Sequence, residues 1–309
     1  MVKPPVASII NFCTNEARFL RACIEECRHF SRQILIPVCT HFHDGTMENY
    51  ALLDQIYRAF PDCQFIEFPF VPNEISPKVF RKISPAHFWH SASRAVACQF
   101  LSDEIERVLF LDADEVPEGK RFLAWLDESD YAQHTVLKLA NYWYFREPRY
   151  RADQLEDSIV FARRGSLDLP VLLHEEERNA IYDLLPHPKK RKVVGLDRKP
   201  MFHHFSWVRT KEEMLRKTEK WGHRDDRDWK SLIEIEFAGA FSGKAFIHGY
   251  SYQECKPPFE ISMGEVVFLP ERAGQISRLT QSELFSLLEL PRKRGWKKFF
   301  TFPRNFFRT

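Results

Sequence analysis

Two aspartates separated by one residue follow a short apolar run in the middle of the chain. Asp112 and Asp114 come directly after residues 108–111, and Glu115 follows them. An apolar run of this length fits a short buried strand, so the carboxylates are expected at its carboxyl end. Oxygen ligands spaced in this way can converge on Mg²⁺ or Mn²⁺, which commonly carries a phosphate on its other side. An acidic turn that caps a following helix, opened by Pro117, would give the same pattern.

The residues before these aspartates predict the elements that would position them. Apolar runs typical of strands alternate with helical patterns. Strands are expected at 6–13, 33–39, 63–68 and 107–112, and helices after Glu16, from Glu48 to Phe60 and from Pro85 to Ser102. This βαβαβ order predicts a parallel sheet with right-handed crossovers. The aspartates would then lie at the carboxyl edge of the sheet, where open α/β sheets bind their ligands.

The composition is that of an ordinary globular chain. It has 309 residues, 44% of them hydrophobic, which suffices for one large α/β domain with additions or for two domains. The 45 basic and 43 acidic residues leave a net charge of +2, so nothing global indicates nucleic-acid binding. Seven cysteines without a Cys-x-x-Cys pair predict neither a disulfide framework nor a zinc cluster. The sequence shows neither a membrane-spanning apolar stretch nor a signal peptide's apolar core, so a cytoplasmic protein is expected.

Short polar motifs follow three of the expected strands. They are Asn15-Glu16 after the first strand, Asp44-Gly45-Thr46 after the second, and Asp112-Ala113-Asp114-Glu115 after the fourth. In this order they resemble the nucleotide-sugar-binding half of family-two-type glycosyltransferases with the GT-A fold. Residues 160–165, His174-Glu175 and 201–207 resemble later signatures of the branch that includes lipopolysaccharide-core glucosyltransferases, so the similarity covers residues 5–210. The resemblance implies an α/β fold with a Rossmann-type, mostly parallel central sheet flanked by helices.

The resemblance also implies a metal-dependent reaction. A sugar would move from a nucleotide-diphosphate sugar, normally UDP-linked, to a hydroxyl of a glycan or glycolipid, with inversion. Mn²⁺ or Mg²⁺ would stabilise the leaving diphosphate, with Asp114 as a direct ligand and Asp112 bound through water or to the ribose. His204 would complete the metal shell. Adjacent strand residues point to opposite sides, so His203 would then face away from the metal.

The same resemblance assigns donor binding and proton transfer. The nucleotide sugar would be bound by Thr14, Asn15, Glu16, Asp44, Asp112, Asp114, Arg163 and Arg164. An inverting transfer needs a carboxylate that removes the acceptor's proton, and Glu175 resembles the family's acid, with Asp157 in reserve. These enzymes commonly carry an acid several residues before Asp44 that contacts the nucleotide base. Here that place holds Cys39 or Thr40, which leaves the identity of the base open.

Two other classes of protein fit parts of the pattern. A haloacid-dehalogenase-type phosphohydrolase also has an apolar strand that ends in Asp-x-Asp, but its nucleophilic aspartate normally ends the first strand, and here three strand patterns precede Asp112. A catalytically silent nucleotide-binding protein on the same scaffold would be consistent with the missing acid near Cys39. Phosphatase activity without a nucleotide sugar, or nucleotide binding without turnover, would identify these classes.

The βα alternation stops after residue 206, which predicts a GT-A-like domain at 1–206 and a helical extension at 207–309. The extension ends in a basic aromatic tail, 291–309, with seven cations, six aromatic residues and no acid. This composition suits peripheral contact with anionic lipid on the inner face of a membrane. Packing of the phenylalanines into the body is the alternative, and no nucleic acid is expected. The basic run 188–193 matches a short nuclear import signal, a pattern also frequent in solvated loops.

Overall fold

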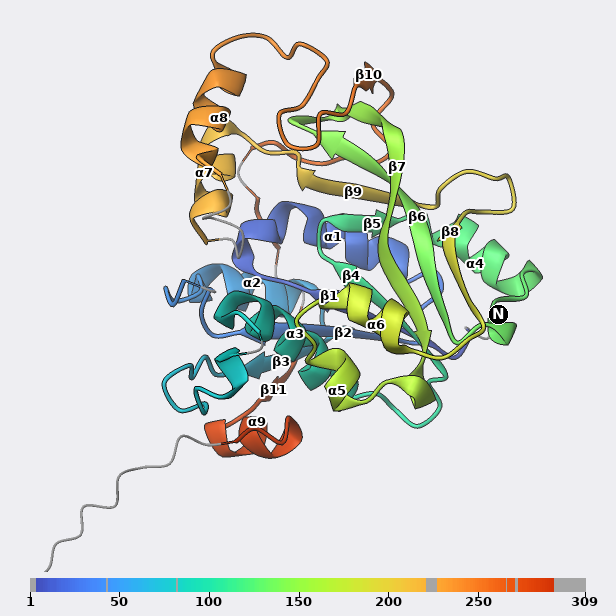
Figure 1. Ribbon diagram of the computed structural model, residues 1–309, viewed down its shortest axis with the longest axis vertical. Helices are drawn as coiled ribbons and strands as arrows, with labels where there is room; N and C mark the ends of the chain where they lie inside the picture. Colours follow the sequence, from blue (N-terminus) through green and yellow to red (C-terminus); the bar gives the residue numbers. More distant parts are fainter. Residues whose placement is uncertain are drawn as a thin grey trace, which may run out of the picture.

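The computed structural model describes residues 4–291 apart from 43, 82, 221–226, 265, 270 and 271. Within these residues the chain forms one large β-sheet with helices on both faces (Figure 1). The predicted α/β fold with a large central sheet flanked by helices is therefore confirmed. Residues 292–309 of the basic aromatic tail lie outside the described part of the chain, so membrane contact through the tail stays a prediction.

Eleven strands of the described chain belong to this sheet, in the order β11-β3-β2-β1-β4-β7-β6-β9-β5, with β10 beside β7 and β8 beside β6. The strands are Val6–Asn11 (β1), Gln33–Cys39 (β2), Gln64–Phe68 (β3), Arg107–Asp112 (β4), Glu115–Pro117 (β5), Val136–Phe145 (β6), Glu147–Arg163 (β7), Lys189–Val193 (β8), Phe202–Trp207 (β9), Tyr252–Glu254 (β10) and Gln275–Arg278 (β11). The helices are Ala17–Cys27 (α1), Tyr50–Ala59 (α2), Pro85–Cys98 (α3), Gly119–Glu128 (α4), Leu169–Leu172 (α5), Arg178–Leu184 (α6), Lys211–Lys220 (α7), Trp229–Phe237 (α8) and Gln281–Leu287 (α9).

The first half of the chain has the predicted βα alternation. Strands β3, β2, β1 and β4 run parallel, and Ala7 of β1 lies between Gln33 of β2 and Val108 of β4. The chain leaves β1 toward β2 and β3 on one side and later returns to β4 on the other side. A crevice forms outside the carboxyl ends of the strands at such a topological switch point. Asp112 ends β4 at this edge, as the sequence predicts.

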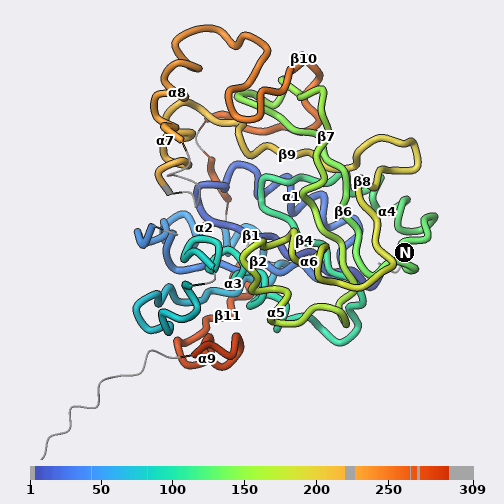
Figure 2. Tube along the Cα trace, in the orientation of Figure 1, coloured from blue at the N-terminus to red at the C-terminus, as the bar shows by residue number. Residues whose placement is uncertain are grey.

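The sheet is buried on both faces. Val6 and Ile10 of β1 share a core with side chains of α1, α2 and α4, whereas Ala7 and Ile9 share a second core with side chains of α3, α5, α6 and α9 (Figure 1 and Figure 2). This two-sided burial explains why β1 is a nearly continuous apolar run. Each fully buried isoleucine contributes roughly 1.5–3 kcal/mol, so the strands that carry the site are held firmly from both sides.

The turn after β4 differs from the expectation. The sequence predicts a helix opened by Pro117, but Glu115–Pro117 forms the short edge strand β5, and α4 begins at Gly119. Proline has no N–H to donate, which an edge strand tolerates. Strand β5 pairs with β9 and thereby places Glu115 beside His204. A Cβ at Gly119 would lie 2.0 Å from a carbonyl oxygen of α1, so the close approach of α4 to α1 requires glycine there.

The C-terminal part covers one end of the sheet. Helices α7 and α8 lie side by side (Figure 1) and pack on β6 and β9 through a cluster that includes Trp143, Trp207, Met214 and Ile233. Strands β10 and β11 from this part join the sheet at β7 and β3. The expected helical extension therefore also contributes two strands. None of the helices in the described residues is long and apolar enough to cross a membrane.

The basic run 188–193 lies largely in β8, which pairs with β6. Its side chains are partly engaged: Lys189 donates to the Tyr182 carbonyl at 2.9 Å, and Arg191 donates to Asp157 at 2.9 and 3.0 Å. The run is thus largely part of the sheet and not a solvated loop, which was the alternative that its composition suggested.

Candidate active site at the carboxyl edge of the sheet

A cavity of about 360 Å³ opens at the carboxyl ends of β1, β2 and β4. It occupies the topological switch point, where the fold favours ligand binding. Its polar lining comes from many separate parts of the chain and includes Asn11, Asn15, Glu16, Glu48, His87, His90, Asp112, Asp114, Glu177, His204, Lys217 and His248. Phe12, Phe42, Trp143 and Trp207 supply aromatic surface. The cavity therefore joins the predicted aspartates to residues from the second half of the chain.

Asp112 is already compensated by cations of the protein. Its Oδ1 accepts a hydrogen bond from Arg94 and its Oδ2 accepts one from Arg178, both at 3.1 Å. Burial favours the protonated carboxyl, but Arg178 and Arg94 outweigh it and hold the pKa of Asp112 well below its usual range. Asp112 is therefore ionised and tied to two guanidinium groups, which makes it a less available metal ligand than Asp114.

One carboxylate oxygen of Asp114 faces a histidine. The residue is 3% exposed, and its Oδ1 has no hydrogen-bond donor among the described residues. That oxygen lies 3.5 Å from Nε2 of His204, while Oδ2 lies 3.6 Å from Nζ of Lys217. Burial opposes ionisation, but Lys217 and His204 outweigh it and lower the pKa of Asp114. His203 points the other way and binds Tyr144 and Glu118 at 2.8 and 2.9 Å, so the two adjacent histidines face opposite sides as predicted.

The Asp114–His204 pair fits a divalent metal ion. A buried carboxylate oxygen that accepts no hydrogen bond in the described part of the chain, with an imidazole 3.5 Å away, provides the donor types that suit Mn²⁺. No group of three or more His, Cys, Asp or Glu side chains placed to hold a metal ion is found among the described residues, so Asp114 and His204 would leave most coordination positions of a bound ion open. Open positions suit an ion that keeps waters and binds the phosphates of a substrate. The other ring nitrogen of His204, Nδ1, makes no hydrogen bond within the described residues and lies 3.9 Å from Oε1 of Glu115.

The acidic run 175–177 enters the cavity through Glu177. Glu175 and Glu176 are exposed and do not line the cavity, so the structure does not bring Glu175 to the site. Glu177 has a φ of 51°, a left-handed conformation that costs a non-glycine residue roughly 1–3 kcal/mol and recurs at functional sites. Asp157 also lies outside the cavity lining, where it pairs with Arg191 at 2.9 Å and Lys138 at 3.6 Å.

Glu177 forms a charged pair with α3. Its carboxylate accepts from Nδ1 of His90 at 2.5 Å and from Arg94 at 3.4 Å. Burial favours protonation of Glu177, but His90 and Arg94 outweigh it and lower the pKa of Glu177. Burial likewise disfavours the charged form of His90, yet Glu177 and Asp112 raise the pKa of His90 to about 9. No sequence signal separates Glu177 from its acidic neighbours, whereas the four-residue spacing of His90 and Arg94 does predict a shared helix face.

The turn after β1 is held by acids and cations from distant segments. Thr14 donates to Glu48, a 5% exposed carboxylate that lines the cavity beside Cys39. Glu16 accepts from Arg209 and from Lys217, the latter at 3.3 Å. The acid expected near Cys39 to contact the nucleotide base is thus absent from β2. Glu48 instead places a carboxylate in the cavity lining that also includes Cys39. The sequence alone indicates Glu48 only as the start of a helix.

Asp44, Arg163 and Arg164, which were also predicted to bind the nucleotide sugar, lie outside the cavity lining. Asp44 is exposed and accepts from Thr46 N–H and Oγ1 at 2.8 and 2.7 Å, so it stabilises its own turn. Arg163 lies beside Arg107 at the amino end of β4, and Arg164 donates to the Ile105 carbonyl at 3.4 Å. Both arginines are therefore at the opposite edge of the sheet from Asp112. The structure does not bring these three residues into the cavity.

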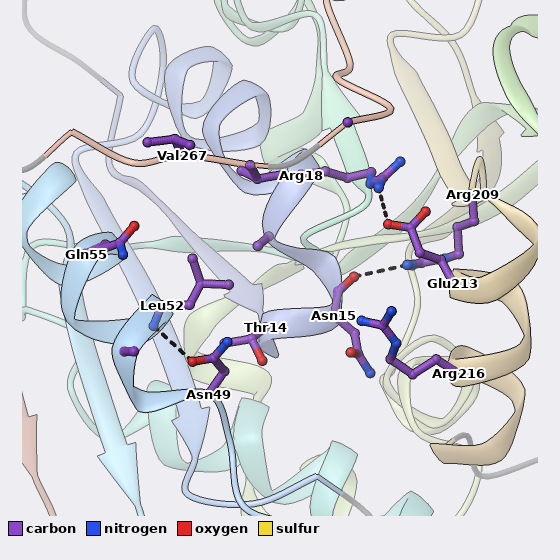
Figure 3. Close-up of a pocket in the computed structure, with 14 residues that line it drawn as sticks. Thr14, Asn15, Arg18, Asn49, Leu52, Gln55, Arg209, Glu213, Arg216 and Val267 are labelled. Atoms are coloured by element: carbon purple, nitrogen blue, oxygen red, sulfur yellow. Dashed lines mark hydrogen bonds and ion pairs between the residues drawn. The ribbon is translucent and has the colours of Figure 1, made fainter.

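A second cavity of about 430 Å³ shares Asn15 with the first (Figure 3). It lies between the starts of α1 and α2 and the side of α7, and its polar lining includes Asn49, Gln55 and Arg216. In Figure 3 the side chain of Arg216 extends from α7 toward Asn15. The turn that carries Asn15 therefore separates two neighbouring hollows.

No protein-family model matches the chain, and no curated protein matches it either. Solved structures match it at low identity. The glycosyltransferase GlyE of Streptococcus pneumoniae is 13% identical with a TM-score of 0.37, over 77% of this chain and 64% of GlyE. S. aureus TarS is 13% identical with a TM-score of 0.38, over 77% and 73% of the two chains. A 4-diphosphocytidyl-2C-methyl-D-erythritol synthase of Anaerococcus prevotii is 7% identical with a TM-score of 0.38, over 70% and 96%. Likeness at this level assigns no family to the chain.

Proposed function

We propose that this chain is a metal-dependent glycosyltransferase. It would move a sugar from a nucleotide-diphosphate sugar, UDP-linked by preference, to a hydroxyl of a glycan or glycolipid, with inversion. The observation that carries the proposal is the buried Asp114–His204 pair at the switch point of an α/β sheet, in which the carboxylate Oδ1 faces the imidazole at 3.5 Å and accepts no hydrogen bond from the described residues. The sequence motifs at the ends of β1 and β4 support it, because both line the same cavity.

Asp114 and His204 are the residues that would hold the metal. Mn²⁺ or Mg²⁺ bound there would neutralise the charge that develops on the leaving diphosphate. Asp112 would take a different role, because Arg94 and Arg178 already neutralise its carboxylate. We assign Asp112 to orienting the donor ribose or a metal-bound water.

Glu48 is proposed to contact the nucleotide base in place of the acid that is missing near Cys39. Its buried carboxylate lines the cavity and is held by Thr14 and by the Asn49 N–H at 3.2 Å. A carboxylate accepts hydrogen bonds, and the imide N–H of uracil donates one. This match supports a UDP-linked donor.

Glu177 replaces Glu175 in our proposal as the carboxylate that receives the acceptor's proton. Its low pKa keeps it ionised at neutral pH but makes it a weak base. A weak base suffices if the proton leaves late, after the acceptor oxygen has begun to bond to the anomeric carbon and has gained positive charge. The pair formed with His90 at 2.5 Å holds the carboxylate in place for this step.

Thermal-shift measurements with uridine, UMP, UDP and UDP-sugars, each with and without Mn²⁺, test the proposal. A ligand that binds the native state raises its melting temperature, so wild type should show a metal-dependent shift with UDP and UDP-sugars. Asp114→Asn should lose this metal dependence while keeping the melting temperature of the free protein within a few degrees. Asp44→Asn is the matched control, because Asp44 lies on an exposed turn outside the cavity.

The same panel distinguishes the competing outcomes. Absence of any nucleotide shift in wild type would contradict the proposed function, and an unchanged metal dependence in Asp114→Asn would contradict the assigned ligand. Metal-dependent binding without transfer to any glycan or glycolipid acceptor would instead indicate a silent binding protein.

A further inference from the structure

Helix α7 is fastened to the turn between β1 and α1 by charged contacts. Arg18 of α1 pairs with Glu213 of α7, and Arg209, just before α7, donates to the Asn15 carbonyl at 3.0 Å (Figure 3). Lys217, one turn further along α7, lies 3.3 Å from Glu16. The helix is therefore held against the loop that flanks the proposed donor site, although it lies about a hundred residues after the aspartates.

Two cations of this region approach Asp114, and they differ in exposure and in the number of hydrogen bonds that hold them. Arg209 is 2% exposed and is fixed by bonds to Glu16, the Ser206 carbonyl and the Asn15 carbonyl. Lys217 instead lines the cavity, and its Nζ lies 3.6 Å from Oδ2 of Asp114 as well as 3.3 Å from Glu16. A lysine ammonium is a compact charge on a flexible stem, so it can redirect its N–H groups without moving the helix.

These charges predict that Lys217 leaves Asp114 when a metal ion and a diphosphate enter the cavity. In the free protein Lys217 is the cation nearest to Oδ2 of Asp114. A divalent ion bound to Asp114 would repel the ammonium and satisfy the carboxylate, whereas a diphosphate in the same cavity would attract it. Charged hydrogen bonds to phosphate oxygens are among the stronger polar contacts in proteins.

We propose that Lys217 is a ligand of the donor diphosphate, so that α7 supplies a positive charge to the leaving group. The inference rests on the proposed function and adds a residue of the C-terminal part to the site. When the bond between the anomeric carbon and the diphosphate oxygen breaks, its electron pair stays on that oxygen. Lys217 remains protonated and donates a hydrogen bond to the diphosphate, while the new bond forms to the acceptor oxygen, whose proton passes to the general base.

The test measures nucleotide affinity in EDTA, where no metal contributes, by calorimetry with uridine, UMP and UDP. Lys217→Met should weaken UDP binding about tenfold to a hundredfold relative to wild type and leave uridine binding unchanged, because uridine has no phosphate. Lys217→Arg should keep most of the UDP affinity. Lys211→Met is the control on the same helix, since Lys211 does not line the cavity.

A purely structural role for Lys217 gives a different result. If the lysine serves only to compensate Glu16 and Asp114, Lys217→Met lowers the melting temperature of the free protein but leaves the ratio of UDP to uridine affinity unchanged, and the inference is wrong. Lys217→Arg retains the charge and reports on UDP affinity even if the methionine variant is unstable. Wild type that binds none of the three ligands would contradict the proposed function itself, which separates the two failures.

Discussion

Replacing Arg178 should cost more stability than replacing any exposed arginine. Its guanidinium is 12% exposed and donates to Asp112 at 3.1 Å and to Glu115 at 3.0 Å, and the Glu115 side chain is 0% exposed. Arg178→Met would remove this cation from the fully buried carboxylate of Glu115 and from the carboxylate of Asp112, whose side chain is 23% exposed. Removing one partner of a buried ion pair typically costs about 3–5 kcal/mol, because the remaining charge is desolvated and uncompensated. The loss would be a large fraction of a typical free energy of unfolding of about 5–15 kcal/mol.

The measurement is urea unfolding at neutral pH followed by circular dichroism. Arg58→Met is the matched control, because the Arg58 side chain is 55% exposed and pairs at 3.0 Å with Asp54, whose side chain is 60% exposed. An exposed ion pair contributes only about 0–1 kcal/mol, so the control should stay close to wild type. Equal losses in the two variants would refute the reasoning that burial of Glu115 makes Arg178 essential to the fold.

Two further predictions concern the Glu177–His90 pair. Glu177→Gln should keep nucleotide affinity but lower transfer about a hundredfold or more, whereas Glu175→Gln should transfer normally because Glu175 is exposed outside the cavity; a larger loss in Glu175→Gln would return the role to that residue. Glu177 and Asp112 raise the pKa of His90 from 6.5 to about 9 despite burial, so folding favours the protonated ring. The stability contributed by His90 is complete below its unfolded pKa and is lost as pH rises through about 9. His90→Gln should therefore lower the free energy of unfolding more at about pH 6 than at about pH 10, and equal losses at both pH values would contradict the assignment.

Local sequence patterns determined the framework of the site. The strands β1 to β4 and the helices between them follow from apolar runs and helical spacing, which depend on neighbouring residues. Because parallel strands align their carboxyl ends, the position of Asp112 and Asp114 at one edge of the sheet followed directly. The opposite orientations of His203 and His204 also followed from strand geometry alone.

Only the tertiary structure decided which charged residues are available for chemistry. Asp112 and Asp114 look equivalent in the sequence, but Arg94 and Arg178 bind the first, whereas one oxygen of the second has no donor in the described part of the chain. The pairing of β5 with β9 sets the distance between His204 and Asp114, and the docking of α7 brings in Lys217.

Tertiary structure also distinguishes Glu175 from Glu177. They lie two residues apart, yet only Glu177 lines the cavity. The difference arises at the start of α6, where a left-handed backbone conformation directs Glu177 toward His90 on α3. Burial and charge compensation depend on partners that are tens to hundreds of residues away, and no local pattern encodes those distances. The sequence therefore predicted the edge of the sheet that carries the site, while the packing of distant segments selected the residues that face the cavity.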